Sequence, residues 1–115
     1  MAAQLAAQLG DLAPGSAKRI ELVDATGQVV RVALVRAEDG SWHAIGDECS
    51  HGQVSLAEGD VEGCRLECWL HGSQFDLVTG EPMQLPATKP VPIYPVTFDG
   101  EQVLATAAAT WIAPR

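Results

Sequence analysis

The sequence is poor in positive charge. Its 115 residues contain 7 Lys and Arg against 15 Asp and Glu, which gives a formal net charge of −8. Such an acidic surface disfavours nucleic acids and anionic membranes as partners and favours a protein with a basic docking face. We therefore expect no nucleic-acid or membrane partner, and we expect a protein partner that approaches by electrostatic attraction.

Long apolar runs and paired cysteines are also scarce. The stretch Met1–Leu12 is apolar but lacks a positively charged start and a run long enough to span a bilayer. Three cysteines, an odd number, do not suggest a disulfide framework. These features predict a cytoplasmic protein, and the length suits one domain, expected to be monomeric.

Alternating β-branched runs and turn signals predict an all-β fold. The runs 18–23 and 28–36 flank the turn sequence that starts at Asp24, and a third strand is expected over 41–45. A further hairpin is predicted around Asp99-Gly100, and its strands should return to this first sheet. The Ala-, Gln- and Leu-rich composition of residues 1–10 predicts a short helix or a frayed end.

The middle of the chain is richer in glycine and proline than the segments on either side. Six glycines lie between Gly46 and Gly80, with a small hairpin expected near Gly63 and a strand over 74–78. Five prolines between 82 and 95 then predict a stiff covering loop over 81–92. We expect a base formed by about 15–45 and 91–108, with an inserted subdomain of about 46–90 that needs a metal for its stability.

Two matched loops in that subdomain carry metal-ligand residues. The first reads Cys49-Ser50-His51-Gly52, the second reads Cys68-Trp69-Leu70-His71-Gly72, and sixteen residues separate His51 from Cys68. Each loop offers one thiolate and one imidazole. We expect Cys49, His51, Cys68 and His71 to be the ligands of one metal centre.

An iron–sulfur cluster suits this ligand set. Most clusters are held by four thiolates, and replacing two of them by histidine on one iron raises the reduction potential. The reason is charge, because a [2Fe–2S] core with two thiolates and two neutral imidazoles is neutral when oxidised. The two cysteines are expected on the inner iron and the two histidines on the outer one.

Two other interpretations use the same residues. A structural zinc site is possible with two cysteines and two histidines, although finger-type spacing pairs Cys with Cys and His with His. A thiol enzyme would need Cys49 or Cys68 to be left unligated beside two histidines. Of the remaining residues, Cys64 is expected to point into the small subdomain as a buried hydrophobe. His43 is expected to be a surface or hydrogen-bonded histidine and not a ligand.

The two loops, followed by Phe75-Asp76 and Thr79-Gly80, resemble the Rieske ferredoxins, small electron carriers that serve ring-hydroxylating and related non-haem iron oxygenases. The resemblance spans about 18–105. It implies the Rieske iron–sulfur fold, an antiparallel β-sandwich base with an inserted cluster-binding subdomain. It also implies one [2Fe–2S] cluster per chain and a proline-containing third loop at 85–90 that shields the cluster.

Departures from the membrane-anchored Rieske proteins refine this picture. Those proteins have a disulfide between the two loops, but the matching positions in this chain hold Val54 and Leu70. They also have a tyrosine at the position of Phe75. Ser73 matches a serine that donates to a bridging sulfur. One lost hydrogen bond and an acidic surface both lower the potential, so we expect roughly −150 mV, the low end of the Rieske range.

The histidine count favours a carrier over an enzyme. An oxygenase needs a second iron held by two histidines and a carboxylate, but only His43 is left over, and no glycine-rich nucleotide motif occurs. We therefore expect a one-electron carrier between a flavoprotein reductase and a terminal non-haem iron oxygenase. The alternatives are a subunit or redox sensor of a larger assembly, of the cluster-assembly or nitrite-reductase type, and a zinc-stabilised interaction module.

Overall fold

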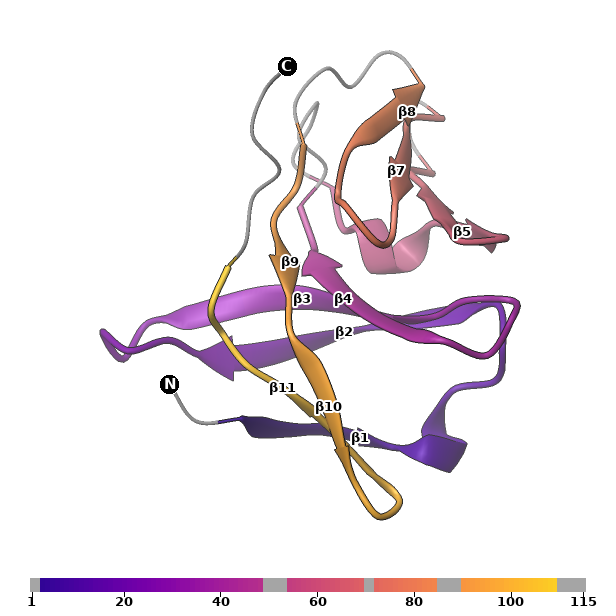
Figure 1. Cartoon of the computed structure of the whole chain (residues 1–115). Helices are drawn as coiled ribbons and strands as arrows, with labels where there is room; N and C mark the ends of the chain where they lie inside the picture. Colours follow the sequence, from indigo (N-terminus) through magenta and orange to yellow (C-terminus); the bar gives the residue numbers. More distant parts are fainter. Residues whose placement is uncertain (1–2, 49–53, 70–71, 85–89, 110–115) are drawn as a thin grey trace.

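The computed structural model describes residues 3–48, 54–69, 72–84 and 90–109, and Figure 1 shows that they form three antiparallel sheets. The described helical segments are two single 3₁₀ turns, η1 (Leu9–Asp11) and η2 (Leu56–Glu58). The prediction of an all-β fold is therefore confirmed. Within the described ranges, no helix is long and apolar enough to cross a membrane.

The central sheet contains the predicted meander. Its strands are β2 (Ser16–Val23), β3 (Val29–Arg36), β4 (Trp42–Gly46) and β9 (Ile93–Tyr94), in the order β2-β3-β4-β9. The β2–β3 turn forms as expected, because the Asp24 carboxylate accepts hydrogen bonds from the backbone N–H groups of Thr26 and Gln28. Gly27 adopts φ +84°, the left-handed conformation that glycine tolerates best.

Residues 4–8 form a strand, so the prediction of a short helix or frayed end over 1–10 was wrong there. Strand β1 (Gln4–Gln8) pairs with β11 (Gln102–Ala105), which in turn pairs with β10 (Val96–Asp99) in a separate sheet. The predicted hairpin at Asp99-Gly100 is present, but its strands join β1 and not the central sheet. Residues 4–8 form a strand because they pair with β11, which lies nearly a hundred residues further along the chain.

The central sheet is buried on both faces. Leu22, Val32 and Leu34 pack toward the β1-β11-β10 sheet, whereas Ala33, Val35 and Ile45 belong to the core on the opposite side. The continuous apolar run 32–35 is consequently fully buried, as expected for a strand covered on both sides. Figure 1 shows the three layers, with the third sheet across β3 and β4 from β1.

The third sheet is formed by the middle of the chain, and its core is shared with one face of the central sheet. It consists of β5 (Asp60–Glu62), β6 (Arg65–Glu67), β7 (Gln74–Asp76) and β8 (Pro82–Gln84), paired in sequence order. The hairpin at Gly63 is confirmed, and its core includes Leu66 and Phe75, both fully buried.

Two details of the third sheet differ from expectation. Strand β7 ends at Asp76, not at 78, because the Asp76 carboxylate accepts the N–H groups of Val78 and Thr79 and turns the chain. The expected loop over 81–92 begins with β8. Pro82 is tolerated as the first residue of an edge strand, since its missing N–H breaks no essential ladder bond.

Candidate metal centre

The second predicted ligand loop begins directly after β6 with a buried thiol. The Cys68 N–H donates to the Ser73 carbonyl at 2.6 Å, and the Gly72 N–H donates to the Cys68 carbonyl at 3.0 Å. Gly72 adopts φ +75°, which lets the turn close. The closed turn fixes the Cys68 side chain in the subdomain core with 1% exposure, where a sulfur ligand would be shielded from water.

Two other residues of this turn lie where they can influence a metal group. Ser73 is fully buried next to the closed turn, and its hydrogen bond to a cluster sulfur stays a prediction. Trp69, by contrast, is 51% exposed immediately after Cys68. It is therefore a surface residue and not part of the core. His71 lies outside the described residues.

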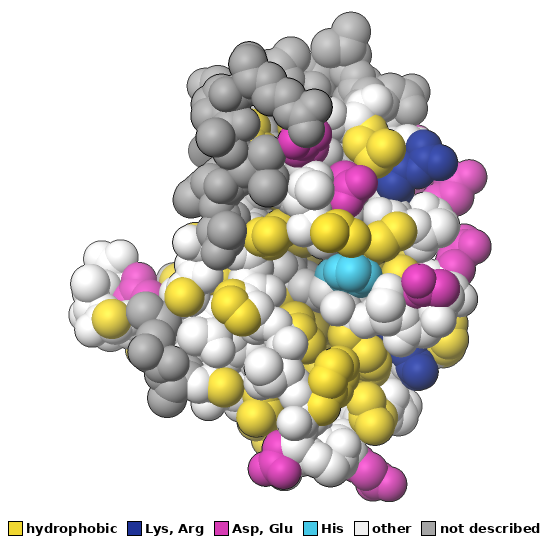
Figure 2. Space-filling model, in the orientation of Figure 1, with side chains coloured by type: hydrophobic (Ala, Val, Ile, Leu, Met, Phe, Trp, Pro, Cys, Tyr) yellow, Lys and Arg dark blue, Asp and Glu magenta, His cyan; other side chains and the backbone are white. Residues whose placement is uncertain are grey.

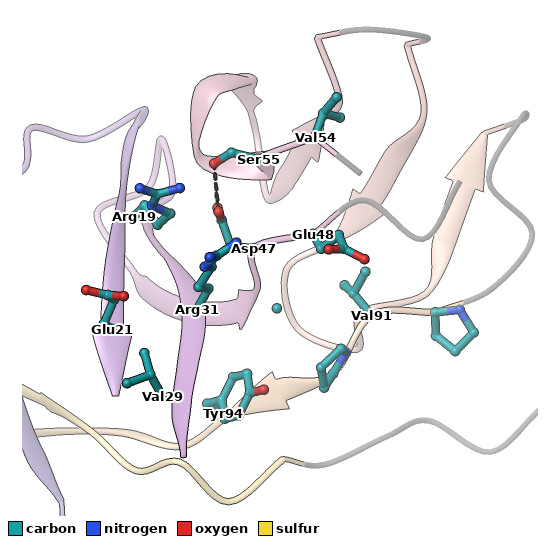
Figure 3. A pocket seen from close by; sticks show the side chains of 13 residues that line it. Arg19, Glu21, Val29, Arg31, Asp47, Glu48, Val54, Ser55, Val91 and Tyr94 are labelled. Carbon is teal, nitrogen blue, oxygen red and sulfur yellow. Dashed lines mark hydrogen bonds between the residues drawn. The ribbon is translucent and has the colours of Figure 1, made fainter. Parts of the chain in front are cut away.

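The first predicted ligand loop has its two ends held together, although Cys49 and His51 themselves lie outside the described residues. The Ser55 hydroxyl donates to both carboxylate oxygens of Asp47, at 2.7 and 2.9 Å, and the Ala57 N–H donates to the same carboxylate at 3.0 Å. Glu48 and Ser55 form an isolated antiparallel bridge. The described residues on the two sides of 49–53 therefore lie next to each other. Figure 3 shows Asp47 pointing at Ser55.

The ends of the proline-rich segment are anchored beside these loops, while residues 85–89 lie outside the described part of the chain. The Gly46 N–H donates to the Pro92 carbonyl at 2.8 Å, and the Val91 N–H donates to the Gly80 carbonyl at 2.9 Å. A Cβ atom at Gly46 would approach the Pro92 ring to 2.9 Å, so only glycine allows this contact. Residues 91–92, which follow the predicted third loop, are thus tied to both β4 and the β7–β8 turn.

A cleft of about 790 Å³ lies between the central sheet and the described residues that flank 49–53 (Figure 3). Among the residues lining it are Arg19, Glu21, Arg31, Glu48 and Tyr94. Burial raises the pKa of the Tyr94 phenol above its ordinary value. Charges of both signs line this cleft, so it suits polar groups better than an apolar small substrate.

His43 and Cys64 lie outside this cleft, where β4 contacts the β5–β6 turn. The Ser41 hydroxyl donates to the Asp39 carboxylate at 2.6 Å and therefore accepts from His43 Nε2 at 2.8 Å. Burial lowers the pKa of His43, and Asp39 opposes this shift. His43 is hydrogen-bonded, as predicted.

Cys64 is half-buried against the subdomain core, with its sulfur 3.7 Å from His43 Nε2. Burial raises the pKa of its thiol. Cys64 packs against the core as expected, but it is only partly buried and not the buried hydrophobe that the sequence predicted. Among the described residues no group of three or more Cys, His, Asp or Glu side chains could hold a metal, because only Cys68 of the predicted set lies there.

The Asp47–Ser55 pair was missed by sequence reasoning. The available signal was an Asp two residues before Cys49 and a Ser just before the apolar turn 56–58, a pattern typical of a capped helical turn. Nothing in the pattern indicated that the two side chains bond to each other across the ligand loop.

Comparisons with known proteins agree with this arrangement. The family model for the Rieske [2Fe–2S] domain matches residues 2–95. The 3-phenylpropionate/cinnamic acid dioxygenase ferredoxin subunit of Escherichia coli (strain K12) is 38% identical over 99 residues, which cover 85% of this chain and 87% of that protein.

Two solved structures are similar in fold and sequence. The ferredoxin of carbazole 1,9a-dioxygenase from Nocardioides aromaticivorans IC177 gives a TM-score of 0.80 at 33% identity, covering 92% of this chain and 98% of that one. A ferredoxin solved in complex with the oxygenase of carbazole 1,9a-dioxygenase gives a TM-score of 0.80 at 31% identity, covering 90% of this chain and all of the matched one. The family model spans most of the chain, and the close relative is a ferredoxin subunit of similar length. The chain therefore belongs to the Rieske [2Fe–2S] domain family.

Proposed function

We propose that Cys49, His51, Cys68 and His71 hold one [2Fe–2S] cluster per chain, with the cysteines on the inner iron and the histidines on the outer one. Three observations support this ligand set: the Cys-x-His and Cys-x-x-His spacing, the buried thiol of Cys68, and the bonded ends of the first loop. The donor set fits the group, since thiolate and imidazole are the ligands of such clusters. The division into a base and a subdomain of about 46–90 is part of the same proposal.

The bound cluster would supply a one-electron redox centre, and the chain's own residues prepare its surroundings. Leu66 and Phe75 close the interior side of the subdomain, so water is excluded behind Cys68. Phe75 offers no hydroxyl to a nearby sulfur, and this supports a potential near the low end of the Rieske range.

The chain is an electron carrier and not an enzyme. Its relatives are ferredoxin components of dioxygenase systems, and its family is that of the Rieske [2Fe–2S] domain. After two histidines are assigned to the cluster, only His43 is left, and it is bonded to Ser41. This family membership is the single observation that carries the function, and it sets aside the zinc module and the thiol enzyme.

We further propose the partners. The acceptor is a terminal non-haem iron oxygenase, supported by the structural relative that was solved with its oxygenase. The donor is a flavoprotein reductase, because no nucleotide motif occurs in this chain. Figure 2 shows Asp and Glu side chains around the rim of one face with few Lys and Arg among them. With the net charge of −8, this favours weak, fast docking to a basic surface.

The same proposal places a monomeric chain in the cytoplasm. A reducing compartment suits a protein whose third cysteine, Cys64, is a free thiol. Neither an acidic surface nor the cleft beside Glu48 favours nucleic acid.

A pair of cysteine variants tests the ligand set and the function together. Cys68→Ser should lose the visible and EPR signals of the cluster, whereas Cys64→Ser should keep both. The wild-type and Cys64→Ser proteins should then be reduced by a flavoprotein reductase and reoxidised by an oxygenase. A colourless wild-type protein, or a cluster that survives in Cys68→Ser, would contradict the proposal.

A further inference from the structure

Asp47 is an unusual side chain for its position. Of the described residues, only Asp47 and Ser73 are buried polar or charged side chains, and Asp47 is 3% exposed. It follows β4 and stands two residues before Cys49. Covalent geometry alone therefore keeps the Cα atom of Cys49 within about 8 Å of that of Asp47, because consecutive Cα atoms are about 3.8 Å apart.

The bonds to Asp47 close the first ligand loop. Its carboxylate accepts the Ser55 hydroxyl and the Ala57 N–H, and its carbonyl oxygen accepts the Leu56 N–H. Its own N–H donates to the Arg31 carbonyl at 3.3 Å. One residue therefore joins the central sheet, the start of the loop and the turn η2 that ends it.

The charge of Asp47 is not neutralised by an ion pair. In the described ranges the sole ion pair joins Lys18 and Asp11. Arg31 lines the same cleft (Figure 3) but lies beyond ion-pair distance of Asp47. The carboxylate instead accepts hydrogen bonds from the Ser55 hydroxyl and the Ala57 N–H. A buried negative charge next to a redox group disfavours the addition of an electron to that group.

We propose that Asp47 is a positioning residue of the metal centre, which ties together the ends of the loop carrying Cys49 and His51 and whose charge keeps the reduction potential low. This inference rests on the ligand set proposed above. It assigns separate tasks to the two partners: the Ser55 hydroxyl contributes only the bond, whereas Asp47 contributes both the bond and the charge.

The charge is tested with Asp47→Asn against Asp39→Asn. Asp39 is the control because its carboxylate also accepts a bond from a serine hydroxyl, and Asp39→Asn removes the same charge. Asp39 is exposed and lies before β4, whereas Asp47 is buried and lies after it. A unit charge about 10 Å away at an effective dielectric constant of about 20 changes an equilibrium about tenfold. Asp47→Asn should therefore raise the equilibrium constant for one-electron reduction about tenfold, or about 59 mV in midpoint potential, and Asp39→Asn should leave it within about twofold.

The bond is tested with Ser55→Ala against Ser55→Thr and Ser41→Ala. Ser55→Ala keeps the charge and should leave the potential unchanged, but cluster loss to a chelator, followed by visible absorbance, should be about tenfold faster. Ser55→Thr keeps the hydroxyl and should lose the cluster at the wild-type rate. Ser41→Ala, which removes the matched bond to Asp39, should also behave as wild type.

Each result decides the proposal. A cluster-bearing Asp47→Asn protein with the wild-type potential would overturn it, and so would equal rates of cluster loss in wild type and Ser55→Ala. If Asp47→Asn takes up no cluster while Asp39→Asn does, the comparison of Ser55→Ala with Ser55→Thr decides. Faster cluster loss from Ser55→Ala but not from Ser55→Thr supports the proposal. Equal rates of cluster loss in the two variants overturn it. A wild-type protein without a [2Fe–2S] cluster would overturn the proposed function instead.

Discussion

Replacing Gly80 by alanine measures how firmly the proline-rich segment is held against the subdomain. Gly80 adopts φ +77°, and a Cβ atom there would overlap the Val91 carbonyl oxygen and approach Ile93 Cγ2 to 3.3 Å. The Gly80 carbonyl also accepts the Val91 N–H at 2.9 Å. Because the overlap is with backbone, no rotation of a side chain relieves it, and the two segments must separate.

The expected cost has three parts. An alanine in the left-handed conformation costs about 1 kcal/mol. Loss of the Val91–Gly80 hydrogen bond costs about 1 kcal/mol, and partial exposure of Val91, now 2% exposed, costs about 1 kcal/mol more. Gly63→Ala is the matched control, since Gly63 has φ +60° with no atom within 4 Å of a Cβ. It should lose about 1 kcal/mol only.

Thermal unfolding of the cluster-bearing protein, followed by far-UV circular dichroism, separates the two variants. At about 4 °C per kcal/mol for a domain of this size, Gly80→Ala should unfold about 12 °C below wild type and Gly63→Ala about 4 °C below. Equal decreases would show that the contact between Gly80 and Val91 is not tight and would refute the reasoning.

Three further predictions follow from the structure. Burial lowers the pKa of His43 in the folded protein. The neutral imidazole therefore contributes fully to folding stability above the unfolded pKa of about 6.5. This contribution is lost as the pH falls through the lower folded pKa, because the folded state must then accept the proton. The decrease in unfolding free energy between pH 7 and pH 5, measured in urea, should therefore be smaller in His43→Gln, and an equal decrease would contradict the assignment. Phe75→Ala empties a fully buried site and should cost roughly 3–5 kcal/mol in the same assay, whereas a loss below about 1 kcal/mol would show that the site collapses. Raising the ionic strength should slow electron transfer to a basic-faced oxygenase, and a flat salt response would refute docking by charge.

The parts of the fold that depend on local signals could be predicted. The turns at Asp24 and at Asp99-Gly100 form where their sequences indicated, because their turn chemistry lies within a few residues. Strand β1 could not be predicted, since its partner β11 lies almost at the other end of the chain. The state of such a segment depends on pairing that no local pattern contains.

The candidate site also has a part that the sequence predicts and a part that only the structure shows. The four proposed ligands stand out because two loops repeat one spacing of Cys and His. The clamp formed by Asp47 and Ser55 does not stand out, because Asp and Ser are ordinary surface residues and only burial reveals their bond. The sequence thus indicates what binds the metal, and the structure adds what holds the binding loop in place.

Pulsed EPR of the reduced protein tests the central claim most directly. If two histidines and two cysteines hold the cluster, the spectrum should contain nitrogen couplings from two imidazoles, and these couplings should change when the protein is labelled with ¹⁵N-histidine. His43→Gln should leave them unaltered, because His43 is bonded at the β4 seam. A reduced cluster without strong nitrogen couplings, or a protein that binds a single metal ion, would contradict the account.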